Sequence, residues 1–371
     1  MIGKLFQNLL KRKVTGGRKR KIRGFTLIEL LISILIAGLI VTALLDLVID
    51  LLQTDRREYA RTETQREMQL ATDFIVNDVR EAVYIYSNEE LNDDRPNQPG
   101  RLRNYLPDFG NGVEPVLAFW KTDPFPYRED QQLPNCGPRP QADPVPADWA
   151  RCNSLRVRRR TFTLVVYLLA QNTRDDSARG WKGVSRIMRY ELRQYNAGTG
   201  TTAEINTQNQ GYAEPLANNV TFASWPYNSN GQNMQSSRPA YDRNDPNSRP
   251  PVLVDFVDFA TMSRRTDNHQ DGLTPPADPR LQCPTGYSAI PPQGNPSNFD
   301  NPSFAACVSS GTTARSSTAA AAAAGSSTNQ DAIIFLRGNP TGKAGVKVAP
   351  LIAIRTQAVA RGVVDKTPTD Q

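Results

Sequence analysis

The feature that most constrains this chain is an apolar run of twenty-one residues near its N-terminus. Residues 25–45 contain one ionisable side chain, that of Glu29. At a rise of about 1.5 Å per residue, a helix of this length spans roughly 30 Å, which matches the hydrocarbon core of a bilayer. Residues 25–45 are therefore predicted to form a transmembrane helix.

The residues before this run are strongly basic. Residues 1–24 contain nine Lys or Arg and no Asp or Glu. The positive-inside rule predicts that this end stays in the cytoplasm and that the rest of the chain is exported. In a secretory signal the small residue at the cleavage site follows an apolar core of about 7–15 residues, whereas here Gly24 precedes a longer run. Any cleavage is therefore expected after Gly24.

Residues 24–29, with the sequence Gly-Phe-Thr-Leu-Ile-Glu, resemble the type IV prepilin and pseudopilin family. The resemblance implies that a prepilin peptidase cuts between Gly24 and Phe25, that the new amine of Phe25 is methylated, and that Glu29 guides assembly. A charge in the hydrocarbon costs on the order of 2.5 kcal/mol or more, so a carboxylate there is also a functional candidate on physical grounds. The alternative is an uncleaved signal anchor in which Glu29 has no role.

The helix is expected to continue beyond the membrane, because residues 25–95 contain no Pro and a single Gly. Residues 53–67 are polar on nearly all sides, and an amphipathic pattern follows. Its predicted apolar stripe, which should lie on a sheet, consists of Ala71, Ile75, Val79, Ala82 and Tyr86. This second part also resembles the corresponding helix of J-type minor pseudopilins and PilW minor pilins. The domain prediction is a leader at 1–24, a membrane helix at 25–45, its continuation at 46–90 and an exported head at 91–371.

The head is predicted to be rich in β-structure, with two long irregular loops at 91–155 and 262–330. The strand candidates are residues 115–120, 161–170, 185–194, 219–225, 252–259, 331–337 and 346–360. The second and third are expected to form a hairpin, and the last two to be buried. The expected fold class is α+β, in which a long N-terminal helix packs on an antiparallel β-sheet, as in pilins.

The net charge of +7 suggests nucleic-acid binding at first sight. Removal of the nine leader charges leaves 35 basic and 37 acidic residues, so the mature chain carries −2. The basic signal is then one of membrane topology, and no nucleic-acid partner is expected for the mature protein.

All four cysteines lie in the exported part, where thiols can be oxidised. Proximity favours the pairs Cys136–Cys152 and Cys283–Cys307, and the alternative is four free thiols in loops. No pair has the Cys-x-x-Cys spacing of a zinc or redox site.

No enzyme activity or cofactor is expected, because His269 is the one histidine and no catalytic motif surrounds it. Asp267, Asp271 and Asp278 have a spacing similar to that of a calcium loop, but a solvated acidic turn explains them as well. The four tryptophans could form a sugar-binding face or belong to the core.

These resemblances imply a minor pseudopilin of a pilus-like secretion machine related to type II secretion and type IV pili. Residues 333–339 and 354–356 resemble strands of pseudopilins of cyanobacterial hormogonium polysaccharide secretion, which implies polysaccharide export. The alternatives are a minor type IV pilin for motility, adhesion or DNA uptake, and a signal-anchored extracellular binding protein. The family resemblance implies four partners, namely the prepilin peptidase, other pilins, membrane lipid, and an inner-membrane assembly platform with its ATPase. The expected location is the inner membrane, with a cytoplasmic N-terminus and an exported head.

Overall fold

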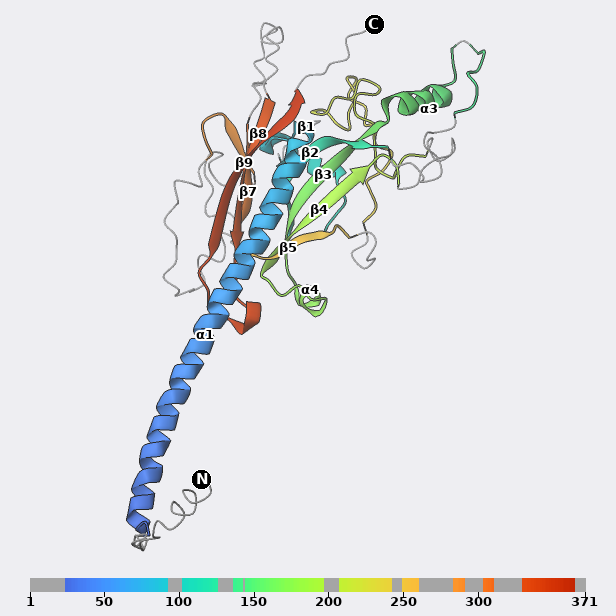
Figure 1. Cartoon of the computed structure of the whole chain (residues 1–371). Helices are drawn as coiled ribbons and strands as arrows, with labels where there is room; N and C mark the ends of the chain where they lie inside the picture. The colour runs from blue at the N-terminus through green and yellow to red at the C-terminus, as the bar shows by residue number, and fades with distance from the viewer. Residues whose placement is uncertain are drawn as a thin grey trace, which may run out of the picture. The chain divides into compact units, whose positions relative to one another are not determined.

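The computed structural model describes residues 24–92, 102–125, 136–142, 144–196, 207–241, 249–259, 283–290, 303–309 and 329–363. The chain divides into two compact units, residues 1–55 and 56–371. The helix α1, Leu27–Arg80, runs from the first unit into the second (Figure 1). The other elements are β1 (Ala82–Ile85), α2 (Asn88–Asn92), η1 (Leu102–Tyr105), β2 (Val113–Pro124), α3 (Ala147–Arg158), β3 (Arg160–Gln171), α4 (Arg174–Ala178), β4 (Ser185–Arg193), β5 (Val252–Val257), β6 (Tyr287–Ile290), β7 (Phe304–Ser309), β8 (Asn329–Gly338), η5 (Lys343–Gly345) and β9 (Ile352–Val363).

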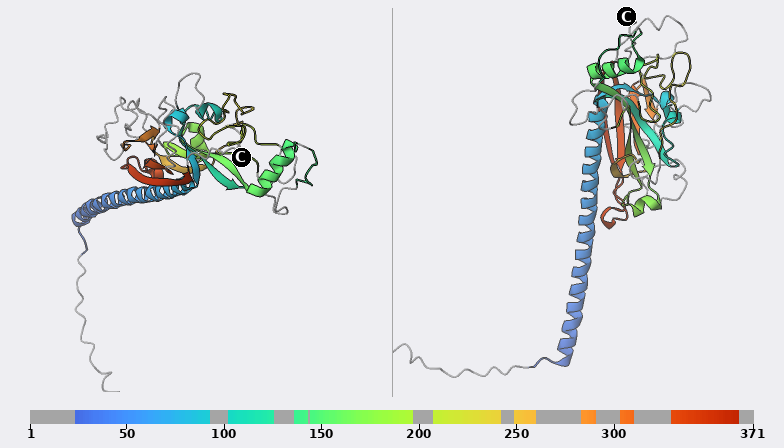
Figure 2. Two further views of the ribbon diagram at one scale, coloured as in Figure 1. Left: turned by 90° about the horizontal axis from the view of Figure 1, so that it is seen from above. Right: turned by 90° about the vertical axis from the view of Figure 1, so that its right-hand side faces the viewer.

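The strands form one antiparallel sheet in the order β1-β2-β3-β4-β5-β8-β7-β6, with β9 also paired to β8. Within the described residues, β5 and β8 are joined by one register pair, Val257 with Gly338. The sheet therefore has two parts, which lie on either side of residues 56–80 of α1 (Figures 1 and 2). The predicted α+β class, with a long helix on an antiparallel sheet, is confirmed.

Residues 56–80 of α1 bury one face on the sheet. The buried residues recur every three or four positions, as expected for an amphipathic helix, and they are Ala60, Thr64, Met68, Ala71, Thr72, Ile75, Val76, Asp78 and Val79. Gly338 of β8 lies directly beneath this face. A Cβ atom there would stand 2.9 Å from Met68 Cγ and 3.0 Å from Thr64 Cγ2, so the glycine permits the close approach of helix and strand.

The prediction that the helix continues to residue 90 is wrong. The helix ends at Arg80, and Ala82–Ile85 form β1, which pairs with β2. Ala82 and Tyr86, the last two members of the predicted stripe, are buried by the sheet rather than by a helix. Val83, Tyr84 and Ile85 favour a strand, and here that preference decides because β2 offers an unpaired edge.

The described part of the predicted loop at 91–155 contains η1, β2 and the start of α3. The strand β2 is twelve residues long, twice the predicted length, and it pairs with both β1 and β3. Its Pro115 occupies a register shift between Pro115 and Leu117, which explains how a residue without an N–H group is accommodated in an interior strand. The helix α3 at the end of this segment was not predicted. In the second predicted loop, 262–330, the described residues include β6, β7 and the start of β8.

Four strand predictions are confirmed with small shifts, those of β3, β4, β5 and β8, and so is the β3–β4 hairpin. Residues 219–225 form turns instead of a strand. There Asn219 has a positive φ of 59° and the side chains of Thr221 and Ser224 hydrogen-bond each other, which replaces ladder bonds by local ones. The last strand begins at Ile352 instead of residue 346, and its Val359 is 51 % exposed, so this strand is not fully buried.

The tryptophans do not form one face. Trp120 and Trp225 are fully buried, with ring centroids 5.4 Å apart. The indole N–H of Trp120 donates to Tyr86 Oη at 2.8 Å, and that of Trp225 donates to the Ala213 carbonyl at 2.7 Å. These two residues are core side chains with satisfied polar atoms.

The cysteines are bonded in the pairs Cys136–Cys152 and Cys283–Cys307. Each pair belongs to a small apolar cluster separate from the main core. Cys136 precedes α3 and Cys152 lies within it, whereas Cys307 is in β7 and Cys283 precedes β6. The disulfides thus hold the two segments that were predicted to be irregular.

A buried ion cluster attaches α1 to the sheet. Asp78 Oδ2 of α1 accepts from Arg189 Nε of β4 at 2.8 Å and from Tyr167 Oη of β3 at 2.8 Å. Its Oδ1 lies 3.0 Å from Lys121 Nζ of β2. One carboxylate on the helix therefore contacts three neighbouring strands.

The environment of Asp78 favours its charged form. Burial alone would raise the pKa of its carboxyl, but the hydrogen bonds and charges of Arg189 and Lys121 outweigh burial and lower this pKa from its usual 3.8. The lowered pKa means that the cluster contributes its full stability above a pH of about 3.8 and loses it as the pH falls through the folded-state value.

Replacement of Asp78 should lower the free energy of unfolding of the head. Asp78→Ala removes the carboxylate that Arg189 and Lys121 share, and leaves Arg189 with Glu191 and Lys121 with Glu81 and Asp123. We expect a loss of about 3 kcal/mol in the free energy of unfolding, measured by urea denaturation at pH 7.

The matched control is Asp73→Ala, because Asp73 lies on the same helix but is exposed, and this change should cost no more than about 0.5 kcal/mol. The difference between the unmodified protein and Asp78→Asn should also shrink below pH 3.8. Equal stability of Asp78→Ala and Asp73→Ala would show that the cluster does not hold the helix.

Candidate functional site

The three residues before α1 are exposed and lie outside any regular element. Phe25 is 79 % exposed, and a Cβ atom on Gly24 would meet no described atom within 4 Å. Gly24 also has no positive φ. Neither packing nor backbone conformation within the described residues therefore requires glycine at this position.

Thr26 starts the helix immediately behind Phe25. Its carbonyl accepts from the N–H groups of Glu29 at 3.1 Å and Leu30 at 3.2 Å, and its hydroxyl accepts from the Glu29 N–H at 3.4 Å. This is the Thr half of a capping box, Thr-x-x-Glu, in which a Glu side chain would return the bond. The signal is visible in the sequence as Thr26 and Glu29, three residues apart, at the start of the apolar run.

Glu29 lies in the first turn of α1, where the positive end of the helix dipole favours a negative side chain. Its carboxylate makes no hydrogen bond or ion pair with the part of the chain that the structure describes, although its backbone is fully engaged in the helix start. The side chain is exposed and can therefore meet a donor from outside the chain.

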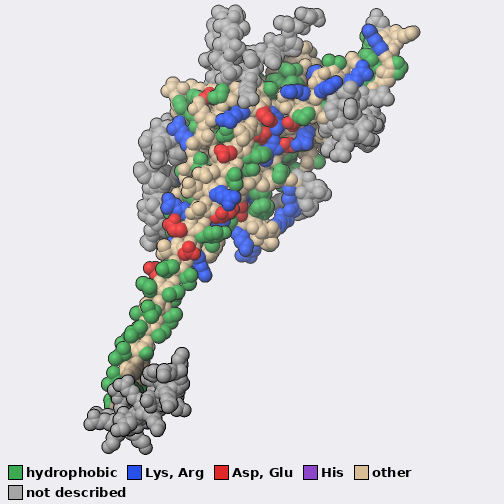
Figure 3. Space-filling view, viewed as in Figure 1, with side chains coloured by type: hydrophobic (Ala, Val, Ile, Leu, Met, Phe, Trp, Pro, Cys, Tyr) green, Lys and Arg blue, Asp and Glu red, His purple; other side chains and the backbone are tan. Residues whose placement is uncertain are grey.

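The first unit presents a continuous apolar surface along α1, shown by the green side chains at its lower end in Figure 3. The most apolar window has a mean hydropathy of 2.7 and no buried residue. The hydroxyls of Ser33 and Thr42 donate back to the carbonyls of Glu29 at 2.7 Å and Gly38 at 3.1 Å, so these polar groups are satisfied within the helix. Among the described residues, α1 is the one helix long and apolar enough to cross a membrane, and it is compatible with a single-pass anchor.

Residues 19–45 match the prokaryotic N-terminal methylation motif. The match spans Gly24, Phe25 and Glu29, and it supports a type IV pilin-like protein or pseudopilin. The motif implies processing by a prepilin peptidase and assembly with other pilins, and it favours a structural role over an enzymatic one. No curated protein and no solved structure matches the chain.

Other predicted sites have different outcomes. Asp267, Asp271 and Asp278, the calcium candidates, lie outside the described residues, as does His269. Within the described ranges no group of three or more His, Cys, Asp or Glu is placed to hold a metal ion.

The second unit has an apolar groove that sequence reasoning did not find. It lies between α1 and β5, has a volume of about 600 Å³, and is lined in part by Leu70, Phe74, Trp181 and Leu253. Leu70 and Phe74 lie beside the face of α1 that is buried on the sheet, and they are 60 % and 47 % exposed; the Arg189 guanidinium of β4 lies 5.7 Å from the centre of the Phe74 ring. Their spacing of four residues is the signal that predicts a second apolar stripe on this helix.

Proposed function

We propose that this chain is a minor pseudopilin, a subunit of a pilus-like secretion machine that serves polysaccharide export. The observation that carries the proposal is the methylation-motif match at residues 19–45, which ends inside an exposed apolar helix. An exposed apolar surface of this length needs lipid or a bundle of similar helices. A fibre subunit meets both environments, first in the membrane and then in the fibre.

The proposed processing site is the Gly24–Phe25 bond. Cleavage there removes nine positive charges, and it leaves the amine of Phe25 next to the first turn of α1. The basic leader supports a cytoplasmic N-terminus, and the two disulfides support export of the head to an oxidising compartment.

Glu29 is the proposed assembly residue. Its carboxylate has no described partner, and an unpaired charge in hydrocarbon is costly. The amine of Phe25 on the same or a neighbouring processed subunit is the cation that would neutralise it. Pairing between subunits would make the apolar helix more stable in the fibre than alone in the membrane.

The large head supports a minor component over a major one. The described residues place β2 and α3 in segment 102–158 and the β6–β7 pair in segment 283–309. The resemblance of residues 333–339 and 354–356 to hormogonium polysaccharide pseudopilins points to polysaccharide. An assembly platform with its ATPase would extend the fibre. The same N-terminal observations also fit a minor type IV pilin, and a deletion strain distinguishes the two: loss of extracellular polysaccharide supports export, whereas loss of twitching alone supports the pilus.

The first test is the mass of the mature protein. We expect the membrane-extracted chain to begin at Phe25 and to carry one additional methyl group on its amine, because residues 19–45 match the methylation motif. Intact-mass and N-terminal peptide analysis measure this directly.

The matched variant for this test is Gly24→Val, which should block the cut while the protein remains in the membrane. A retained leader in the unmodified protein, or a mature N-terminus inside the apolar run, would support the signal-anchored binding protein instead.

The second test separates an assembly carboxylate from an accidental one. Without a role for Glu29, Glu29→Leu removes a costly charge and leaves function intact. If Glu29 pairs with the Phe25 amine, the variant leaves that amine unpaired at a cost of about 3–5 kcal/mol. We therefore expect Glu29→Leu to be cut normally but to fail in crosslinking to sister pilins and in secretion.

The control for this test is Asp46→Leu, which removes another acid from α1 outside the matched motif and should crosslink as the unmodified protein does. Full complementation of a deletion strain by Glu29→Leu, with normal crosslinks, would rule out an assembly role.

A further inference from the structure

A second candidate binding surface lies on α3 and the two residues that follow it. We call residues 147–160 the arginine arm. It carries five exposed arginines and, between residues 149 and 160, no acidic residue. The arginines are Arg151, Arg156, Arg158, Arg159 and Arg160. In Figure 3 their charge appears as the blue side chains along the element at the upper right.

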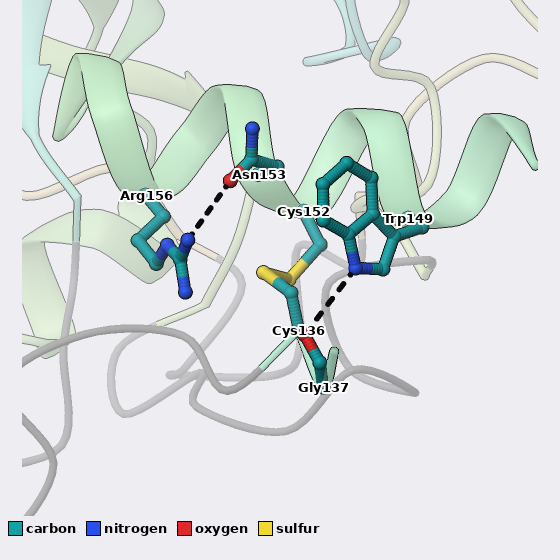
Figure 4. The surroundings of a disulfide bond; sticks show 6 residues. All are labelled: Cys136, Gly137, Trp149, Cys152, Asn153 and Arg156. Atoms are coloured by element: carbon teal, nitrogen blue, oxygen red, sulfur yellow. Dashed lines mark hydrogen bonds between the residues drawn. A yellow bond between two sulfur atoms is a disulfide. The ribbon is translucent and has the colours of Figure 1, made fainter. Parts of the chain in front are cut away.

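The arm is held firmly to the head. The disulfide Cys136–Cys152 joins it to the preceding segment, and the indole N–H of Trp149 donates to the Gly137 carbonyl at 3.3 Å (Figure 4). Cys152 and Leu155 are buried in a cluster whose other members include Phe125 and Tyr195. The arginines thus project from a fixed helix, so a ligand would not have to order a loose segment on binding.

At its far end the arm turns directly into the sheet. Arg159 adopts a left-handed conformation with φ 55°, and its N–H donates to the Leu155 carbonyl, which ends α3. The strand β3 begins at the next residue, Arg160. The last arginines are therefore fixed by both a helix and a strand.

Most of this charge is not balanced within the described residues. Arg158 lies 3.5 Å from Glu214, and Arg156 donates to the neutral side chain of Asn153 at 3.1 Å (Figure 4). For Arg151, Arg159 and Arg160 the described chain provides no ion pair. Five like charges on adjacent turns repel one another, so a bound polyanion would relieve this repulsion.

The positive charge is also local. Without these five arginines, the mature chain has 30 basic and 37 acidic residues, a net charge of −7. The arm is therefore a basic patch on an otherwise acidic protein, and it would direct an anionic ligand to one place.

We propose that the arginine arm binds an acidic polysaccharide, a sugar polymer that carries carboxylates; the choice of a sugar polymer rests on the proposed role in polysaccharide export. Guanidinium groups bind carboxylates with two parallel hydrogen bonds, and all five cations are Arg, with no Lys among them. A flexible polymer with spaced carboxylates can lie along the arm without touching the acidic remainder of the head.

Nucleic acid fits these observations less well. Duplex DNA is stiff and carries one charge per about 1.7 Å, so it would extend beyond the arm over a protein whose remaining net charge is negative. Single strands are bound largely by stacking on exposed aromatic rings. The tryptophan of the arm, Trp149, packs against the disulfide cluster and its N–H is already bonded.

The test measures binding by the chain without its basic leader, residues 25–371, in nanodiscs of zwitterionic lipid, because the nine leader charges would themselves attract a polyanion. Fluorescent polygalacturonate is the probe and neutral dextran is the uncharged comparison. We expect salt-sensitive binding of polygalacturonate and none of dextran. The triple variant Arg151→Gln/Arg156→Gln/Arg160→Gln should weaken binding by about tenfold or more, because three charge contacts are lost. The control Arg57→Gln/Arg61→Gln/Arg66→Gln makes the same charge change on exposed positions of α1 and should stay within about twofold.

Three results would overturn the proposal. The first is that the unmodified protein does not bind polygalacturonate. The second is that both triple variants weaken binding equally. The third is that a DNA duplex of equal total charge binds more tightly through the same arginines. Unchanged thermal unfolding and an intact Cys136–Cys152 bond confirm that the variants are folded. Because the measurement needs neither cleavage nor assembly, failure of the arm to bind is distinct from failure of Glu29→Leu to block the fibre.

Discussion

The fold of the head depends on one buried carboxylate. Asp78 is contributed by the helix, and its partners Lys121, Tyr167 and Arg189 come from three successive strands, so the cluster can form only when β2, β3 and β4 are already in register. Apolar contacts of α1 tolerate small shifts along the sheet, whereas an ion pair in a buried site does not. The stripe of Ile75 and Val79 supplies hydrophobic stabilisation, and Asp78 fixes the position of the helix.

Prediction from the sequence succeeded where the signal is local. The apolar run, the stripe through Ala71 to Val79 and the strands β3, β4 and β8 are specified by their own residues. It failed where a distant partner decides the structure: residues 82–85 become a strand because β2 lies beside them, and β2 accommodates Pro115 through a bulge that its neighbour β3 defines. Likewise, α3 is stabilised by the disulfide between Cys152 and Cys136, and helix propensity takes no account of such a covalent bond.

The functional residues show the same division. Gly24, Phe25 and Glu29 stand out from a short motif, and residues 19–45 match the prokaryotic N-terminal methylation motif, while the roles of the three residues stay predictions. The five arginines of the arm are visible in the sequence at residues 151–160. A net charge summed over the whole mature chain is −2, and such a sum does not reveal a local cluster. The groove beside Leu70 and Phe74 was missed because the residues of α1 that are buried on the sheet form the stronger apolar pattern. Charge and hydropathy must be examined on each surface separately.

The single register pair between β5 and β8 has a mechanical consequence. The direct junction between the two sheet parts is short. Besides the Val257–Gly338 pair it contains the Asp258 N–H bond to the Arg337 carbonyl, the Asn339 N–H bond to the Phe256 carbonyl and the Arg337–Asp258 ion pair, so few interactions share a load applied there. Residues 56–80 of α1 contact both sheet parts. Asp78 binds side chains of β2, β3 and β4. On the other part, Met68 lies against Gly338 of β8, and Glu67 forms an ion pair of 2.7 Å with Lys343, which follows β8. A pulling force transmitted through this helix is therefore divided between the two sheet parts, and the short junction between β5 and β8 carries little of that force.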